Sequence, residues 1–350
     1  MSELNNKNDA HTSIRWKLLM GASVLALTAY VSASGMAKAE ESDHPLIWIE
    51  LGGQLAWNAN GQENFLPPFA FTTPRPPFET TPPEKAEKQA PASWDGDAKV
   101  SFQPEDNNWV LSAQVRYGKS GRHDYLSQLT QHTYDSRAWA FQNITASSSQ
   151  QHAIVDFQAG RDFGLGMGAS SIVSLGIRFA QFNSRAHAFF DSRPQNFNYY
   201  FGAYTRFNAN FDAKRSFSGV GPSLSWDGTA ALAGNVSEGQ IDIDWGSNAA
   251  LLFGRQSVRG LHKTTTVVYP NAYPSPPVHN SVPLNRSKQV IVPNLGGFAG
   301  LSWRLPNAKV AVGYRADFFF GAMDGGIDAA KKENVDFYGP FASVSVGIGG

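Results

Sequence analysis

Lys309 to Gly321 reads K-V-A-V-G-Y-R-A-D-F-F-F-G, and this stretch decides the fold class. Successive side chains of a β-strand point to opposite faces, so one face shows Val312 and Tyr314 while the other carries Arg315 and Asp317 among small residues. About ten residues is the length that a tilted β-strand needs to cross a bilayer. The stretch therefore fits either a soluble β-sandwich or a membrane barrel with its apolar face toward lipid.

Composition favours β-structure with long loops. The chain has 350 residues, of which 33 are Gly and 20 are Pro, and 13% are aromatic. Helical bundles are richer in Ala, Leu, Glu and Lys. The formal net charge is zero, so no overall field attracts nucleic acid. The chain has no cysteine, which excludes disulfides, thiolate zinc sites and cysteine nucleophiles.

The first 39 residues have the pattern of a cleaved export signal. Arg15 and Lys17 precede an apolar run from Leu18 to Ala33. Ala37-Lys38-Ala39 then supplies the small residues of a cleavage site. The alternative, a transmembrane anchor, has a short core here. We expect residues 1–39 to be a signal peptide and residues 40–350 to form one barrel domain.

Ten stretches of the chain alternate in the manner of the first one. They are 46–57, 94–102, 109–118, 153–160, 173–180, 217–226, 241–254, 289–304, 309–321 and 335–348. The connections between them alternate between long and short. The long ones are 58–93, 119–152, 183–211, 255–288 and 322–333, and the short ones are 103–108, 161–170, 227–235 and 305–307.

This sorting of connections decides between sandwich and barrel. Outer-membrane barrels keep short turns on the periplasmic side and long loops outside, whereas a soluble sandwich has no reason to do so. Aromatic residues also gather near the strand ends, where the two membrane interfaces would lie: Trp57, Trp94, Phe102, Trp109, Tyr117, Trp226, Phe253, Trp303 and Phe320. We predict an all-β protein, a single antiparallel transmembrane β-barrel of about ten strands. Residues 58–93, with eight prolines, are predicted to be an extended extracellular loop.

Four stretches resemble a known family. They are S-L-G-I-R-F-A-Q-F (174–182), F-S-G-V-G-P-S-L-S-W-D-G (217–228), G-Y-R-A-D-F-F-F-G (313–321) and Y-G-P-F-A-S-V-S-V-G (338–347). Together they are similar to the Legionella-type major outer membrane proteins, over a region from about Trp94 to the C-terminus. The resemblance implies a pore-forming barrel of the Gram-negative outer membrane, with a porin-like role for small solutes or ions.

The inward faces of the predicted strands carry charges that would line such a pore and set its ion preference. The candidates are Glu50, Asp97, Lys99, Arg116, Asp156, Arg178, Asp242, Asp244, Arg315 and Asp317. The alternative is that these charges pair across the lumen and plug it. Barrels of eight strands are filled by side chains, whereas open channels appear at about sixteen, so ten strands leave both alternatives open.

Catalytic, metal and cofactor signatures are weak. Histidines 123, 132, 152, 187, 262 and 279 lie in or beside predicted extracellular loops, and His123-Asp124 and His187 near Asp191 are the candidates for a hydrolase. No nucleophile elbow, zinc-protease or phosphate-loop motif accompanies them. Asp242-x-Asp244 lacks a calcium-binding loop.

We therefore expect no enzyme activity, no cofactor and no metal. The expected partners are outer-membrane lipid, lipopolysaccharide and small solutes or ions, without nucleic acid. A structural or adhesive barrel is the main alternative function, and a hydrolase is a lesser one.

Overall fold

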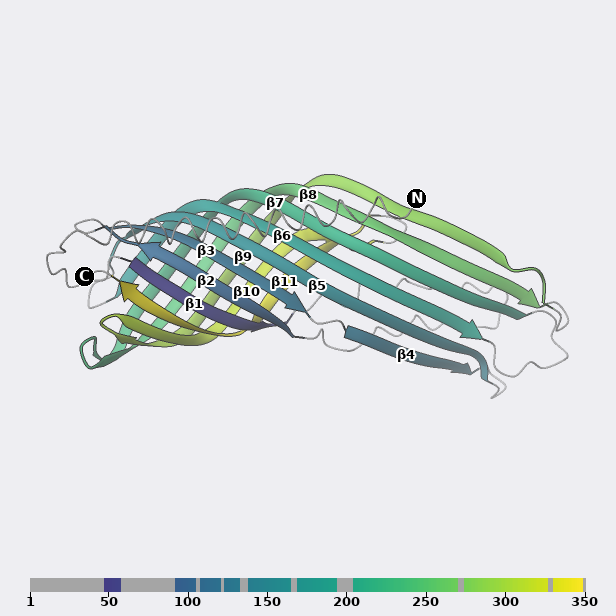
Figure 1. The fold of residues 1–350 in the computed structure, drawn as a ribbon, viewed down its shortest axis with the longest axis horizontal. Coiled ribbons are helices and arrows are strands. Elements are labelled where there is room, and N and C mark those ends of the chain that lie inside the picture. Colours follow the sequence, from purple (N-terminus) through teal and green to yellow (C-terminus); the bar gives the residue numbers. More distant parts are fainter. Residues whose placement is uncertain are drawn as a thin grey trace.

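The strands close into one antiparallel barrel (Figure 1). A computed structural model describes residues 47–57, 92–104, 108–120, 123–132, 138–164, 169–193, 204–269, 274–326 and 330–348. The elements are β1 (Ile47–Ala56), β2 (Ser93–Phe102), β3 (Trp109–Ser120), β4 (His123–His132), β5 (Ala138–Asp162), β6 (Ser170–Arg193), β7 (Tyr204–Asn235), β8 (Gly239–Tyr269), β9 (Val278–Leu305), β10 (Ala308–Asp324) and β11 (Lys332–Ile348). The described part of the chain has no helix long and apolar enough to cross a membrane.

Ten of these strands form the barrel wall. Each pairs with its neighbours in sequence, β1 pairs with β11, and β3 pairs with β5, so that no edge remains in the wall. β4 lies outside this ring and extends the sheet along the far part of β5. The predicted fold class is confirmed, and each of the ten predicted stretches lies on a barrel strand. The predicted signal peptide lies outside the described residues, and so does the predicted Pro-rich loop apart from its last two residues.

Most of the predicted long loops are strands, which corrects the sequence-based boundaries. The β5–β6, β7–β8 and β8–β9 pairs continue in register far beyond the predicted ends, for example from Gly254 to Thr266 opposite Val290 to Val278. The predicted turn at 227–235 is also strand, because β7 runs to Asn235. The reason is that both faces of these extensions carry polar residues. Apolar alternation therefore stops, while the backbone hydrogen bonds between the paired strands continue.

The two ends of the barrel are therefore different. At one end the hairpins turn tightly, as at Pro306 and Asn307; we call this the short-turn end. At the other end β5 to β9 project well beyond the remaining strands, and we call this the hairpin end (Figure 1).

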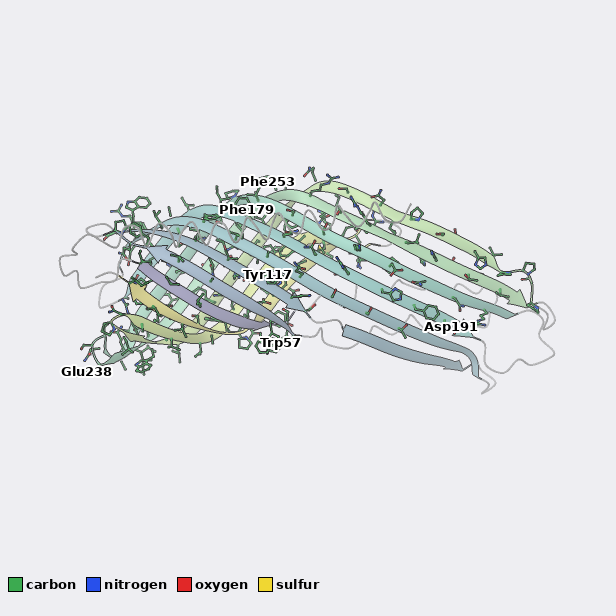
Figure 2. The ribbon with its side chains drawn as sticks, in the orientation of Figure 1. Trp57, Tyr117, Phe179, Asp191, Glu238 and Phe253 are labelled. Atoms are coloured by element: carbon green, nitrogen blue, oxygen red, sulfur yellow. The ribbon has the colours of Figure 1, made fainter. Side chains whose placement is uncertain are left out.

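An apolar band surrounds the outside of the barrel. Val312 is 55% exposed and Leu175 68% exposed, although both are large apolar residues in the middle of strands. Tyr117, Phe179 and Phe253, all exposed, lie with Trp57 at nearly the same height along the barrel (Figure 2). Other exposed aromatic residues border the band near the short-turn end: Phe102, Trp109, Trp226 and Trp303. This surface has the dimensions and aromatic borders of a membrane-facing band.

We expect Val312→Arg to lower the free energy of unfolding by about 2–4 kcal/mol, because it places a cation at the middle of the apolar band. Val312→Ala is the matched control, since it removes a similar contact with lipid without adding charge. Equilibrium unfolding in urea from lipid vesicles would measure both. Equal stability of the arginine and alanine variants would show that this face does not contact lipid.

Candidate functional site: the lumen and its closure

All ten charged residues predicted from the sequence lie on the inward face of the barrel wall. Asp156, Arg178, Asp242, Asp244 and Asp317 are among the most buried side chains of the protein. Alternation along the strands also places Asp95, Asp227, Arg304 and Lys309 on the same face. Asp227 was missed because it fell in a predicted turn, whereas the other three could have been found by extending the alternation to the strand ends.

A buried network centred on Arg178 fills the middle of the lumen. Its Nε and Nη2 atoms donate to the two carboxylate oxygens of Asp156 on the neighbouring strand, at 2.6 and 3.0 Å. Its Nη1 atom donates to Asn248 on β8 at 2.6 Å and also to Asn294 on β9. Arg178 is 2% exposed. One guanidinium thus joins four strands of the wall, β5, β6, β8 and β9.

A second pair crosses the lumen beside it. Nη1 of Arg116 on β3 lies 2.5 Å from Oδ2 of Asp317 on β10. The wall provides space for this pair at Gly296, where an added Cβ atom would lie 2.1 Å from Oδ1 of Asp317. A side chain at this position would therefore displace the carboxylate, which gives this glycine a packing role.

Two more ion pairs continue the network. Arg315 donates to Asp97 at 2.6 Å, and its guanidinium lies 5.0 Å from the ring centroid of Phe341. Gln114 donates to both oxygens of the same Asp97 carboxylate. Nearer the short-turn end, Lys309 lies 2.9 Å from Asp244. These contacts cross-link β2, β3, β8 and β10 through the lumen.

The charged lumen contains little free space. A cavity of about 10 Å³ lies between Gln54, Asp97, Arg116 and Arg315, which is room for about one water molecule. Of the two alternatives left open by the sequence, the described side chains show the paired, filled lumen.

An apolar cluster closes the lumen above the charges, toward the hairpin end. Phe182 is its centre: its ring centroid lies 4.6 Å from that of Phe319 and 5.8 Å from those of Phe217 and Phe337. All four phenylalanines are buried inside the barrel together with Leu252 and Val292. We call this group the aromatic cluster. It separates the charged lumen from the space between the projecting hairpins.

His152 lies at the boundary between the charges and the aromatic cluster. Its Nε2 atom is 3.1 Å from Asp95, and its ring centroid is 3.9 Å from that of Phe337. The sequence placed His152 beside an extracellular loop, and the structure corrects this, because β5 begins earlier than predicted and turns the side chain inward.

The end of the β10–β11 hairpin folds into the barrel mouth over the aromatic cluster. We call residues 321–326 and 330–335 the tip. The register shifts between Phe319 and Met323, and Gly321 has φ of +65°, a conformation that favours glycine. This irregularity bends the hairpin, so that Ala322, Met323 and Val335 are buried.

Side chains of the neighbouring strands β7, β8 and β9 hold the tip by its backbone. Gln256 on β8 donates to the carbonyl oxygen of Gly321 at 2.5 Å. Arg215 on β7 donates to that of Gly325 at 3.1 Å, and Arg286 on β9 to that of Gly326 at 2.6 Å. Arg286 also donates to the carboxylate of Asp324 at 3.1 Å. The tip is thus fastened to three strands of the projecting wall.

Asp324 is the anionic group of this closure. Burial acts to raise the pKa of its carboxyl group. Hydrogen bonds from Arg286 and from the backbone N–H groups of Lys331 and Gly326, together with the charge of Arg286, outweigh this effect and hold the pKa below its ordinary value. Asp324 is therefore ionised at neutral pH.

Of the two candidate pairs for a hydrolase, the structure describes the side chains of one, His187 and Asp191, and does not bring them together. Nδ1 of His187 lies 2.6 Å from Asp212 rather than close to Asp191, and both partners are exposed. Asp191 instead lies 3.7 Å from Arg206. The side chains of His123 and Asp124 are outside the described part. Within the described ranges, no three His, Asp or Glu side chains gather in a metal-binding group.

Solved structures similar to this chain include two autotransporter domains and a transporter. The transport unit of the autotransporter AIDA-I from Escherichia coli is 8% identical, with a TM-score of 0.32 and coverage of 94% of this chain and 98% of that one. The translocator domain of NalP from Neisseria meningitidis is 10% identical (TM-score 0.26, coverage 97% and 97%). The Pseudomonas putida toluene transporter TodX is 9% identical (TM-score 0.22, coverage 85% and 88%). These similarities are too low to carry an argument about function.

The sequence comparison is more decisive. No curated protein matches the chain. The family model of the Legionella pneumophila major outer membrane protein precursor matches residues 95–348, which include nine of the ten barrel strands. The resemblance noted in the sequence is thereby confirmed, and the barrel belongs in the outer membrane. The chain is a member of the Legionella pneumophila major outer membrane protein family.

Proposed function

We propose that this protein is a porin-like channel for small ions or solutes, which the aromatic cluster and the tip hold closed in the conformation described here. The charged lumen is the conduction path. Since bacterial outer-membrane barrels keep their short turns in the periplasm, the hairpin end is extracellular and the tip is an extracellular gate. The proposal includes no catalytic step and no cofactor.

The buried charges of the lumen carry the proposal. A lumen that needed only to be filled would be at least as stable with apolar side chains, because a buried ion pair seldom stabilises more than its hydrophobic replacement. Charges kept at membrane depth and facing a barrel interior are typical of ion pathways. The four linked groups Arg178, Asp156, Arg116 and Asp317 are such charges.

The balance of lumen charge favours cations. Eight carboxylates face inward below the aromatic cluster, from Glu50, Asp95, Asp97, Asp156, Asp227, Asp242, Asp244 and Asp317. Six cations face them, from Lys99, Arg116, Arg178, Arg304, Lys309 and Arg315. The excess of negative charge would make a hydrated lumen more favourable for cations than for anions.

The tip suits the role of a gate because it is attached differently from the strands of the barrel wall. It bends at an irregular segment containing Gly321, and hydrogen bonds and the packing of Met323 and Val335 hold it inward, whereas its pairing with β9 ends at Phe319. An outward movement of the tip would remove Met323 and Val335 from the aromatic cluster. Apolar constrictions of this kind close channels by excluding water, so their opening would let the lumen hydrate.

A structural or adhesive barrel is the second candidate. It is favoured by the filled lumen and by the long hairpins of β5 to β9, which project beyond the apolar band (Figure 1). In that case the lumen charges serve only to connect the strands of the barrel wall, and the protein conducts no ions under any condition.

Planar-bilayer conductance of the refolded protein tests the channel, with Asp324→Asn as the key variant. At neutral pH we expect the wild type to be mostly closed. Asp324→Asn weakens a charge-assisted hydrogen bond to Arg286, and the open probability should rise about tenfold to 100-fold. Asp162→Asn is the matched control, because this carboxylate also has a lowered pKa but caps a turn at the periplasmic end.

The pH dependence has a defined sign. Because the pKa of Asp324 is lowered by folding, its contribution to closure is present above its ordinary pKa of about 4 and is lost as the pH falls through the folded value. The charged residues around it are Arg286, Arg215 and Glu333, together with Lys332 directly opposite on β11 and the adjacent Lys331. Acid should therefore open the wild type and change Asp324→Asn much less. If neither protein shows measurable conductance at any pH, the result would favour the structural barrel instead.

A further inference from the structure

A row of cations crosses the outside of the projecting hairpins. Arg185 on β6 lies directly opposite Lys214 on β7, which in turn lies directly opposite Arg259 on β8. All three side chains are exposed on the outward face, as are Arg255 and Lys263 on β8. We call these five residues the basic collar.

The collar is strongly unbalanced in charge. Two carboxylates lie on the described outward positions of the same hairpins: Asp212, which is bonded to His187, and Asp191, which is buried beside Arg206. Like charges placed directly opposite each other on neighbouring strands destabilise a sheet. The row therefore concentrates positive charge on this part of the outer surface, which favours an anionic ligand.

The height of the collar agrees with a membrane headgroup. Arg255 follows the exposed Phe253 of the apolar band by two residues. Arg185, Lys214 and Arg259 each lie six residues beyond the residue of the band on their own strand, which is Phe179, Val220 and Phe253 respectively. With about 3.3 Å per residue and a tilt of about 40°, Arg255 lies roughly 5 Å and the row roughly 15 Å above the band. An ordinary phospholipid headgroup layer is about 5–8 Å thick, so the row needs a taller, sugar-containing headgroup.

We propose that the basic collar binds the phosphate groups of the phosphorylated glycolipid of the outer leaflet. Its acyl chains would lie on the apolar surface directly below, formed by Ile177, Phe179, Leu251 and Phe253. Arginine is well suited to this contact because its planar guanidinium binds phosphate oxygens in a bidentate manner. The proposal goes beyond the channel function and does not depend on it, since it concerns the outer surface alone.

Binding of purified lipid A to the refolded barrel in detergent, measured by native mass spectrometry, tests the proposal. The triple variant Arg185→Gln, Lys214→Gln and Arg259→Gln should bind bisphosphorylated lipid A about 100-fold more weakly than the wild type, at about 1 kcal/mol for each basic residue near an anionic membrane surface. The control variant Arg161→Gln removes an exposed outward cation of β5 at the opposite end of the barrel and should bind like the wild type. Dephosphorylated lipid A should bind the wild type as weakly as the triple variant binds the intact lipid.

Folding is checked in parallel by the shift in gel mobility on heating. If the triple variant does not fold, Arg259→Gln alone carries the test, with about fivefold weaker binding expected. Unchanged affinity in the folded variant would overturn the proposal, and so would equal affinity of the wild type for the two lipids. Displacement of the lipid by millimolar inorganic phosphate would overturn it as well, because it would indicate a general anion site.

Discussion

Replacing Arg178 with alanine is expected to lower the free energy of unfolding by about 3–5 kcal/mol, because it leaves a buried carboxylate without its partner. Asp156 is 3% exposed and receives two hydrogen bonds from Arg178, and Asn248 and Asn294 lose a donor at the same time. Equilibrium unfolding in urea, followed by tryptophan fluorescence from lipid vesicles, would measure the loss.

The double variant Arg178→Leu with Asp156→Leu separates the charge from the packing. Replacing both partners by apolar residues of similar size should restore most of the stability, since no unpaired charge then remains. The double variant should nevertheless conduct less than an open wild-type channel, because it removes two charges from the path. A loss below about 1 kcal/mol in Arg178→Ala would contradict the filled lumen, since well-hydrated pairs contribute no more than that.

Truncation of Phe182 to alanine should have two effects, one on the stability of the barrel and one on its conductance. Phe182 contacts three other rings at the centre of the aromatic cluster, so its removal leaves a cavity and should cost about 3–5 kcal/mol in the free energy of unfolding. The same cavity thins the apolar closure, so water should enter the lumen more easily. Bilayer recordings at neutral pH should then show channel openings that are rare in the wild type.

Phe179→Ala provides the matched control on the same strand. Phe179 lies three residues away but faces outward and is 37% exposed in the apolar band. Its removal should cost less stability and leave the conductance unchanged. Channel openings in Phe179→Ala but not in Phe182→Ala would contradict the assignment of the aromatic cluster as the closure.

The sequence predicted the barrel because its evidence is local. Alternation with period two assigns each residue of a strand such as Lys309–Gly321 to one face, and no distant residue is needed for this assignment. The sorting of short and long connections then favoured a closed barrel over a sandwich. For this reason all ten lumen candidates lie on the inward face, including Arg315 and Asp317.

Apolar alternation in the sequence did not predict the length of the strands. Between Gly254 and Thr266 the chain stays paired with β7 and β9 through backbone hydrogen bonds, while both of its faces carry polar residues. Apolar alternation reports contact with lipid and not strand pairing, so it marks the height of the membrane and stops there. The sequence pattern therefore predicted loops where the structure has projecting hairpins.

What only the tertiary structure decided is how the inward side chains meet. Arg116 and Asp317 pair although 201 residues separate them, and Arg178 reaches Asn248 and Asn294 from the other side of the lumen. These partners depend on the register and tilt with which ten strands close, which no single strand contains. The inward bend of the tip likewise depends on side chains of β7, β8 and β9 that donate hydrogen bonds to its carbonyl oxygens. Local alternation thus determined which residues face the lumen, and only the closed barrel determined that they fill it.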